Sequence, residues 1–256
     1  MSMMVVWWVL VAGLVVGTTH SRLTHRDAST CTPTFSKVLF NQTEGSQYVQ
    51  YAQHLPDMTG FTLHYWINLL EPANYACPFA YYNEADGTFI QVLVITPLST
   101  PSFVLQVNGV IVSLVQHKVK LVGEWHHVLH SWHSGTGRWS LYVDGRLVQS
   151  ETDERKRGLA VSGGGRAFSG QRHEIITGKY PCDGCGHGLH GWLTLLGFDT
   201  HGIQRANYWM TRMMVSVVAD GCSPEVGGDV INWKNTPRRG YGGAMEAPAN
   251  STCGAF

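Results

Sequence analysis

Short segments rich in β-branched and aromatic residues recur along the chain, and several alternate apolar with polar positions. Gly, Pro, Asn and Asp separate them at intervals of about eight to twelve residues, a spacing typical of β-sandwiches and jelly rolls. Asn108-Gly109 between two such runs is a strong hairpin signal. The pattern predicts an all-β fold instead of alternating β and α units. Strands are expected at residues 36–40, 48–51, 61–69, 79–82, 89–96, 102–107 and 110–115.

One segment has helical periodicity instead. Residues 203–214 contain no Gly or Pro, and their apolar positions recur at helical spacing, which predicts one short surface helix. From residue 236 onward the chain is rich in Gly, Pro and small residues. That composition predicts an irregular C-terminal tail over residues 236–256.

The first residues have the pattern of a secretory signal peptide. An unbroken apolar run over residues 5–16 is followed by small and polar residues. The run is too short to cross a bilayer, which needs roughly 20 residues. Residues 1–21 are therefore expected to be a signal peptide and residues 22–235 a single domain. No later stretch is long and apolar enough for a membrane span, so secretion is favoured over anchoring.

Composition excludes partners that need a strong overall charge. Lys+Arg and Asp+Glu are both 18, so the formal net charge is zero and nucleic acid is not an expected partner. Charged residues make up only 14%, whereas Gly reaches 29 and Trp nine, a composition typical of turn-rich sheets with aromatic cores. Sequons at Asn41 and Asn250 agree with passage through the secretory pathway.

A motif in the hairpin over residues 125–145 is the most specific signal in the chain. His127, Ser131, Trp132 and Ser134 match the pentraxin signature of His, any residue, Cys, any residue, Ser or Thr, Trp, any residue, Ser or Thr. Leu129 departs from it, because the family has cysteine there. Nothing in this motif is catalytic, and it indicates the frame of an extracellular binding domain.

Further segments extend this resemblance to pentraxins over roughly residues 35 to 235. Residues 168–171 (FSGQ) resemble the start of the family's calcium loop, residues 190–198 resemble the strand after it, and residues 228–233 resemble its last strand. The resemblance implies a two-sheet antiparallel jelly-roll sandwich of the concanavalin A/laminin-G kind with one surface helix. It also implies a cyclic homo-oligomer as one assembly of the chain.

The cysteines depart from the family pattern. The disulfide of the pentraxin core would join the positions that hold His64 and Leu129 here, so both partners are lost together. Six cysteines remain, an even number that favours disulfides in a secreted chain. By resemblance to long pentraxins, Cys31 and Cys222 are the expected pair. Cys77 and Cys253 are left for each other, or Cys253 for another chain.

The calcium loop also departs from the family. Pentraxins bind two calcium ions with several carboxylates and amides, and calcium needs six to eight oxygens. At the aligned positions only Asp86 and Glu174 remain as oxygen donors, and Arg172 would place a positive charge in the site. The resemblance therefore implies at most a weak, degenerate calcium site.

The same loop carries Cys182 and Cys185, with His187 and His190 close behind. Two cysteines and two histidines could form a tetrahedral zinc site, although the spacing is wrong for the familiar finger patterns. Secreted Cys-x-x-Cys pairs usually oxidise to a small-loop disulfide, which is the favoured interpretation.

Three functions compete. The leading hypothesis is a secreted, non-enzymatic, pentraxin-like recognition protein of innate immunity, with carbohydrate or phosphorylated surface groups as ligands. The degenerate calcium loop favours instead a structural adhesion module that binds extracellular protein. A lectin-fold glycosidase would need paired carboxylates on one strand face. Glu151 and Asp153 have that spacing, but the basic residues after them indicate a solvated turn.

Overall fold

The computed structural model describes residues 35–41, 47–96, 100–178, 188–203, 208–222, 227–249, 253–254 and 256. The chain divides into two units, residues 1–31 and 32–256. All described residues belong to the second unit. The signal-peptide prediction for residues 1–21 therefore lies outside the described residues.

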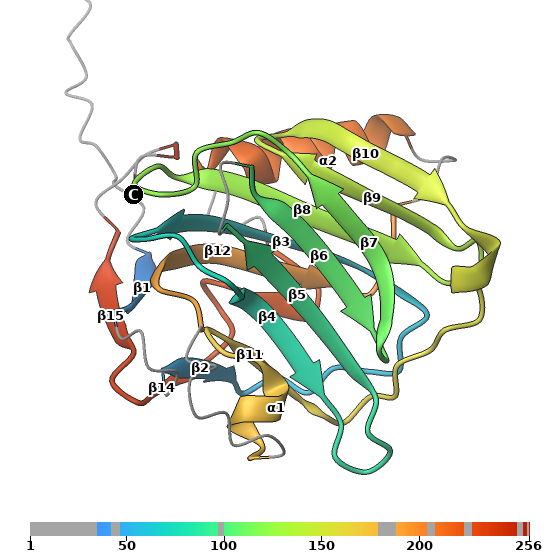
Figure 1. Cartoon of the computed structure of the whole chain (residues 1–256), viewed down its shortest axis with the longest axis horizontal. Coiled ribbons are helices and arrows are strands. Elements are labelled where there is room, and N and C mark those ends of the chain that lie inside the picture. Colours follow the sequence, from blue (N-terminus) through green and yellow to red (C-terminus); the bar gives the residue numbers. More distant parts are fainter. Residues whose placement is uncertain are drawn as a thin grey trace, which may run out of the picture. The chain divides into compact units, whose positions relative to one another are not determined.

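The described strands form two antiparallel sheets (Figure 1). Sheet A contains, in spatial order, β10 (Arg146–Thr152), β9 (Arg138–Val143), β8 (His126–His133), β3 (Gly60–Leu69), β12 (Gly191–Asp199), β1 (Ser36–Phe40) and β15 (Met245–Pro248), and β13 (Ile231–Asn232) pairs with β12. Sheet B contains β14 (Arg238–Tyr241), β2 (Tyr48–Tyr51), β11 (Arg166–Ser169), β4 (Ala76–Tyr82), β5 (Phe89–Ile95), β6 (Ser102–Val107) and β7 (Val110–Gln116). The predicted two-sheet sandwich is confirmed.

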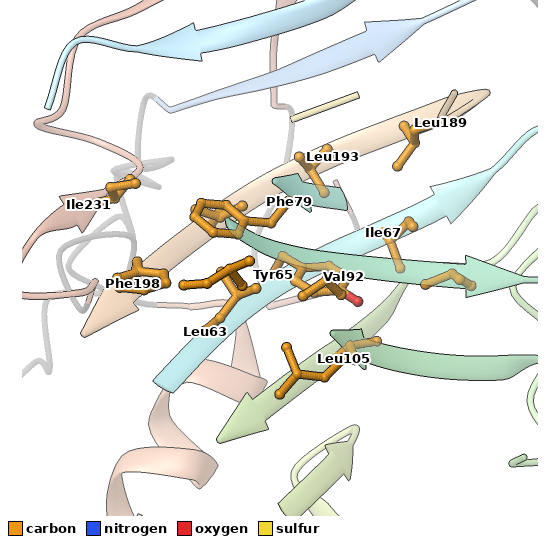
Figure 2. Packing of buried hydrophobic residues seen from close by; sticks show 14 of the residues in the cluster. Leu63, Tyr65, Ile67, Phe79, Val92, Leu105, Leu189, Leu193, Phe198 and Ile231 are labelled. Carbon is orange, nitrogen blue, oxygen red and sulfur yellow. The ribbon is translucent and has the colours of Figure 1, made fainter. Parts of the chain in front are cut away.

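The core lies between the sheets, where side chains from alternate strand positions meet (Figure 2). Phe79 of β4 stacks on Phe198 of β12 with ring centroids 5.2 Å apart, which joins sheet B to sheet A. The predicted hairpin turn between β6 and β7 is confirmed, since Asn108 and Gly109 have φ values of 48° and 81°. Both angles suit the type I′ turn that Asn-Gly favours.

Helix α2 (Tyr208–Asp220) covers the outer face of sheet A, where Val215 and Val218 pack on Leu129 of β8 (Figure 1). The sequence places the helix several residues too early. Ile203, the expected start, instead donates its backbone N–H to the Ser131 hydroxyl at 2.6 Å. Gly221, with φ +64°, follows the last helical residue and supplies the left-handed conformation common just beyond a helix. A short helix α1 (His173–Ile176) and a 3₁₀ turn η1 (Glu154–Lys156) are additional.

The prediction of an irregular tail over residues 236–256 is wrong for two described stretches, residues 238–241 and 245–248, which are strands. β14 pairs with β2 in sheet B, and β15 pairs with β1 in sheet A. Local composition does not predict these two strands, because it is rich in Gly and because their pairing partners lie near the other end of the sequence.

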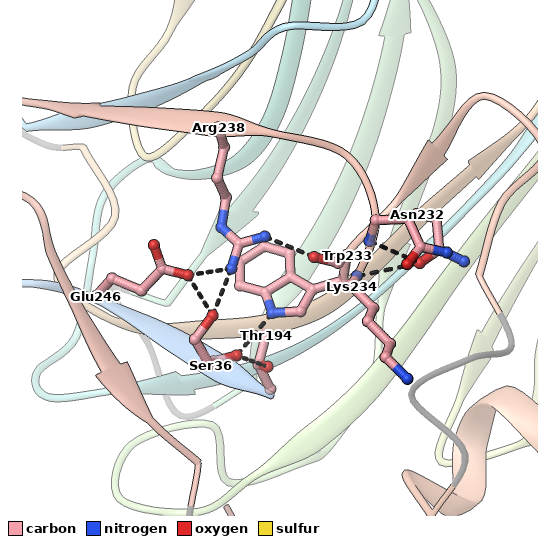
Figure 3. Close-up of polar contacts among 8 residues, drawn as sticks. Ser36, Thr194, Asn232, Trp233, Lys234, Arg238 and Glu246 are labelled. Carbon is pink, nitrogen blue, oxygen red and sulfur yellow. Dashed lines mark hydrogen bonds and ion pairs between the residues drawn. The ribbon is translucent and has the colours of Figure 1, made fainter. Parts of the chain in front are cut away.

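Arg238 of β14 fastens this segment to both sheets (Figure 3). Its Nη1 donates to the Trp233 carbonyl at 2.6 Å, its Nη2 contacts Ser36 and Glu246, and its guanidinium lies 3.9 Å from the Trp233 ring centroid. The Ser36 carbonyl in turn accepts from Trp233 Nε1 at 2.6 Å and from Thr194 Oγ1 at 2.8 Å.

The disulfide prediction needs correction. Cys222, just after α2, is bonded to Cys253, so the expected Cys31–Cys222 and Cys77–Cys253 pairs are both wrong. Cys77 is a free cysteine buried in β4. The resemblance to long pentraxins misled the pairing, because here the link joins two segments that meet beside Trp66, where Gly221 and Gly254 pack. Among the described helices, none combines the length and apolar composition of a membrane span.

Candidate functional site

The signature residues belong to the frame of the fold. His127, Ser131, Trp132 and Ser134 are each at most 2% exposed. His64 lies opposite Leu129 in the β3–β8 register, so the positions expected to have lost a disulfide do face each other across two strands. The signature therefore supports the sandwich and presents no side chain to a ligand.

The histidines of this hairpin separate onto two faces, as strand alternation predicts. His130 points into the core, 3.4 Å from the Tyr65 hydroxyl, and burial lowers its pKa to about 3. His127 points to the α2 side and lies beside His64. Burial, together with the neighbouring His64, lowers the pKa of His127 well below its usual value. These rings are packing elements and form no shared ligand set.

The loop that joins β11 to α1 carries a charged network. Gly170 opens the loop with φ +103°, and a Cβ there would lie 2.3 Å from the Phe40 ring, so only glycine fits. Two residues on, Arg172 Nη2 lies 3.1 Å from Glu174 Oε1. Both side chains are partly shielded, at 31% and 16% exposed.

Gln91 of β5 connects this ion pair to the sheet. In the orientation that satisfies its neighbours, its amide oxygen accepts from Arg172 Nε at 3.1 Å. Its amide nitrogen then donates to Glu174 Oε2 at 3.1 Å and to His173 Nδ1 at 2.9 Å. Gln91 was not among the predicted site residues, although a glutamine inside an otherwise apolar strand was an available signal.

The His173 side chain packs between this network and the aromatic residues of sheet B. Its ring stacks on Tyr82 at 5.0 Å and packs on Phe89 at 4.5 Å, and it is almost fully buried. The aromatic contacts fix the position of α1 on β4 and β5. The neighbouring Arg172 and Glu174 are thereby held in place.

Asp86, the other predicted calcium donor, lies in the turn between β4 and β5. Its carboxylate accepts from Thr88 N at 3.0 Å and from Thr88 Oγ1 at 2.8 Å. A hydrogen bond from the Ser162 hydroxyl, together with these two bonds from Thr88, lowers the pKa of Asp86. Its carboxylate is therefore already engaged by Thr88 and Ser162, and the structure does not link Asp86 to the Arg172–Glu174 pair.

Within the part of the loop that the structure describes, the residues do not fit calcium. Calcium needs six to eight oxygens, usually several of them carboxylates. Here Glu174 supplies one carboxylate, and the Arg172 guanidinium already neutralises it. Within the described ranges, no group of three or more His, Cys, Asp or Glu side chains could hold a metal ion.

The exposed side of the network consists of an aromatic ring and a cation. The Arg172 guanidinium carbon lies 5.6 Å from the centroid of the Tyr75 ring, and Tyr75 is 44% exposed. The Nε and Nη2 atoms are engaged by Gln91 and Glu174. A guanidinium has five N–H donors, so further donors remain for a ligand.

Several predicted sites lie wholly or partly outside the described residues. Cys182, Cys185 and His187 do, so neither the disulfide nor the zinc interpretation is tested. His190 is described, and its Nδ1 lies 2.8 Å from Glu71. Asn41 is exposed at the end of β1, whereas Asn250 is outside the described part.

The carboxylates considered for a glycosidase lie at the edge strand and its loop. Glu151 is exposed in β10, and Asp153 caps η1 and pairs with Arg155 at 2.9 Å. The expected solvated turn is therefore wrong for Glu151, which lies in a strand, whereas Asp153 pairs with the basic residues Arg155 and Lys156. This arrangement offers no support for paired catalytic carboxylates.

Comparisons with known proteins agree with this architecture. Residues 43–188 match the family model described as the concanavalin A-like lectin/glucanases superfamily. C-reactive protein 1.4 of Limulus polyphemus is 27% identical over 207 residues, covering 78% of this chain and 78% of its own. The expected resemblance to pentraxins is confirmed.

Two solved structures share the fold. The native heptameric SAP-like pentraxin from Limulus polyphemus aligns with a TM-score of 0.68 and 21% identity, covering 84% of this chain and 96% of its own. A candidate carbohydrate-binding protein from Bacteroides ovatus aligns with a TM-score of 0.58 and 13% identity, covering 87% and 62%.

Proposed function

Because the chain belongs to the concanavalin A-like lectin/glucanases superfamily, we propose that it is a secreted, non-enzymatic recognition protein that binds surface carbohydrate or phosphorylated groups. The pentraxin relatives and the carbohydrate-binding neighbour in fold support this class of function. Binding takes place at the exposed pair of Tyr75 and Arg172, beside α1, and does not use calcium.

The pairing of Arg172 with Tyr75 is the observation that carries the proposal. Arginine donates paired hydrogen bonds to phosphate, carboxylate and vicinal oxygens, and an exposed aromatic ring beside it offers a flat apolar surface. Glu174 and Gln91 hold the guanidinium from behind, which reduces the entropy lost when a ligand binds. The geometry thus suits an oxygen-rich ligand with an apolar face, such as a sugar ring or a phosphate ester.

The test is binding of the purified protein to a glycan and phospho-sugar array, in calcium and in chelator. We expect the same ligands to be retained in both conditions. Arg172→Gln and Tyr75→Ala should each weaken binding at least tenfold.

The matched control is a second cation–aromatic pair on β14, where the Arg239 guanidinium lies 5.2 Å from the Tyr241 ring centroid. Arg239→Gln should leave array binding unchanged. Loss of binding in this control but not in Arg172→Gln, or binding that disappears in chelator, would contradict the proposed site.

The fold shared with a heptameric pentraxin also supports a homo-oligomer. Light scattering of the protein secreted from eukaryotic cells tests both assembly and export. A mass that is a multiple of the protomer, in culture medium, is the expected result. A monomer retained inside the cell would contradict both parts.

A second candidate function is adhesion to an extracellular protein. β7 is the edge strand of sheet B, carries no charged residue, and exposes Ile111 and Leu114, the latter at 56%. Unprotected edge strands of this kind can pair with another chain. Leu114→Lys should abolish cell adhesion and preserve array binding if adhesion is the function. Array binding lost in Tyr75→Ala alone would favour recognition instead.

A further inference from the structure

We infer that the Arg172 guanidinium is a built-in cation that holds the α1 loop against sheet B, so that the recognition site is assembled without calcium. The statement that the α1 loop belongs to a recognition site rests on the proposed function. The structural role of Arg172 does not.

The first support is that Arg172 bridges two separate elements. Its Nη2 lies 3.1 Å from Glu174 Oε1 on α1, and its Nε donates to the Gln91 amide oxygen on β5 at 3.1 Å. A bound divalent cation commonly performs this task, by joining a carboxylate on one segment to an amide oxygen on another. In this chain a covalently attached cation makes the same kind of connection.

The second support is charge. Arg172 contributes one positive charge and Glu174 one negative charge, so the pair is balanced. Glu174 is only 16% exposed, and an ionised carboxylate in that position needs a counter-charge. A calcium ion placed here would meet a single carboxylate already in use and would be repelled by the guanidinium.

The third support is the closed hydrogen-bond geometry behind the pair. Gln91 is almost fully buried, and its amide contacts Arg172, Glu174 and His173 together. His173 is in turn fixed between Tyr82 and Phe89. The Gln91 amide and the Glu174 carboxylate, which a metal would attract, are therefore already engaged. The planar guanidinium also reaches two partners at once, which a lysine ammonium does less well.

The experiment is thermal melting of the ligand-free protein in millimolar calcium and in chelator. The wild type should melt within about 1 °C of the same temperature in both, since no site gains from calcium. Arg172→Gln leaves Glu174 without its counter-charge. Its melting temperature should fall by about 2–6 °C, as expected for losing a partly buried charged contact in a domain of this size.

Two further variants separate the bridge from general damage. Arg172→Lys keeps the charge and loses the planar fork, so its melting temperature should lie between those of the wild type and Arg172→Gln. The exchanged pair Arg172→Glu with Glu174→Arg should recover part of the loss, because opposite charges face each other again.

The matched control is Arg155→Gln, which removes an arginine paired with Asp153 at 2.9 Å but 89% exposed. It should change the melting temperature by less than about 1 °C, since exposed ion pairs contribute little. Hydrogen exchange of α1 should accelerate in Arg172→Gln and stay unchanged in this control.

The inference is overturned if calcium raises the wild-type melting temperature by several degrees, or if Arg172→Gln melts like the wild type with unchanged exchange in α1. These measurements use no ligand. The proposed function can therefore fail on the array while the structural role of Arg172 stands, and the reverse outcome is equally distinguishable.

Discussion

His64 of β3 and His127 of β8 lie side by side on the outer face of sheet A, with ring centroids 5.6 Å apart. Burial lowers the pKa of His64 to about 4, and burial together with the nearby His64 lowers that of His127. The imidazole Nδ1 of His64 and both ring nitrogens of His127 are buried without a hydrogen-bond partner among the described residues. Both histidines are therefore held neutral.

Acid should destabilise the protein through this pair. A histidine whose pKa is lower in the folded state than in the unfolded chain destabilises the fold at any pH where only the unfolded chain is protonated. Above about pH 6.5 the two histidines cost no stability. Between about pH 6.5 and 4 the free energy of unfolding falls, by up to about 1.4 kcal/mol per pH unit for each histidine. Denaturant titrations at pH 7.5, 6 and 5 should show this fall.

His64→Leu removes one titrating group and should make the slope between pH 6.5 and 4 shallower. His126→Gln is the control, because its contact with Asp144 raises the pKa of His126, and the variant should not reduce acid sensitivity. An unchanged slope in His64→Leu would contradict the assignment.

Asp199 at the end of β12 should act with the opposite sign. Burial, aided by the nearby Asp229 carboxylate, raises its pKa to about 6. The ionised form is therefore disfavoured in the folded state, and stability is lost as the pH rises from about 4 through 6. Asp199→Asn keeps an oxygen that can accept from Asp229 N, which lies 2.9 Å from the native carboxylate.

At pH 7.5 the free energy of unfolding of this variant should exceed that of the wild type by about 1–3 kcal/mol, and near pH 4 the two should differ little. Denaturant titrations measure both values. Asp229→Asn is the comparison, because it removes the neighbouring charge and leaves Asp199 buried. Equal stability of Asp199→Asn and wild type at pH 7.5 would rule out the raised pKa.

Arg238 should be one of the most sensitive positions of the C-terminal segment. Its side chain is 8% exposed and contacts Trp233, Ser36 and Glu246. Arg238→Ala should reduce the free energy of unfolding by about 2–4 kcal/mol, because it removes these bonds and leaves the Trp233 ring uncovered. Chemical denaturation measures the loss. The exposed neighbour Arg239, changed to Ala, should alter stability by less than about 0.5 kcal/mol.

Peptide mapping of the purified protein should recover Cys222 linked to Cys253 and Cys77 as a free thiol. Burial raises the pKa of Cys77, so a thiol reagent should modify it only after denaturation. We also expect Cys182 to be linked to Cys185. Free thiols at both positions together with stoichiometric zinc would instead favour the metal interpretation of that loop.

Local pattern was sufficient for most strands of the two sheets. β1, β2 and β6 match their predicted bounds, because β-branched residues and turn residues mark them directly. β3 is buried at nearly every position, and on the face that alternation would leave polar, Trp66 donates to the Val218 carbonyl of α2. Its second half accordingly lacked a period of two in the sequence.

Other features depended on contacts between distant segments. The partners of Cys222 and Arg238 lie in parts of the chain whose approach no local pattern records. In the candidate site, resemblance located Glu174 and drew attention to Arg172. The role of Gln91 required the structure, because a single polar residue in a strand does not reveal which loop packs over it.

The positions of β1 and β2 have a consequence for synthesis. β1 pairs only with β12 and β15 among the described strands, and β2 only with β11 and β14. Both strands leave the ribosome long before any of these partners exists. They must remain unpaired while β3 to β10 are made, so we expect a late docking step in folding and a need for chaperones that shield exposed strands.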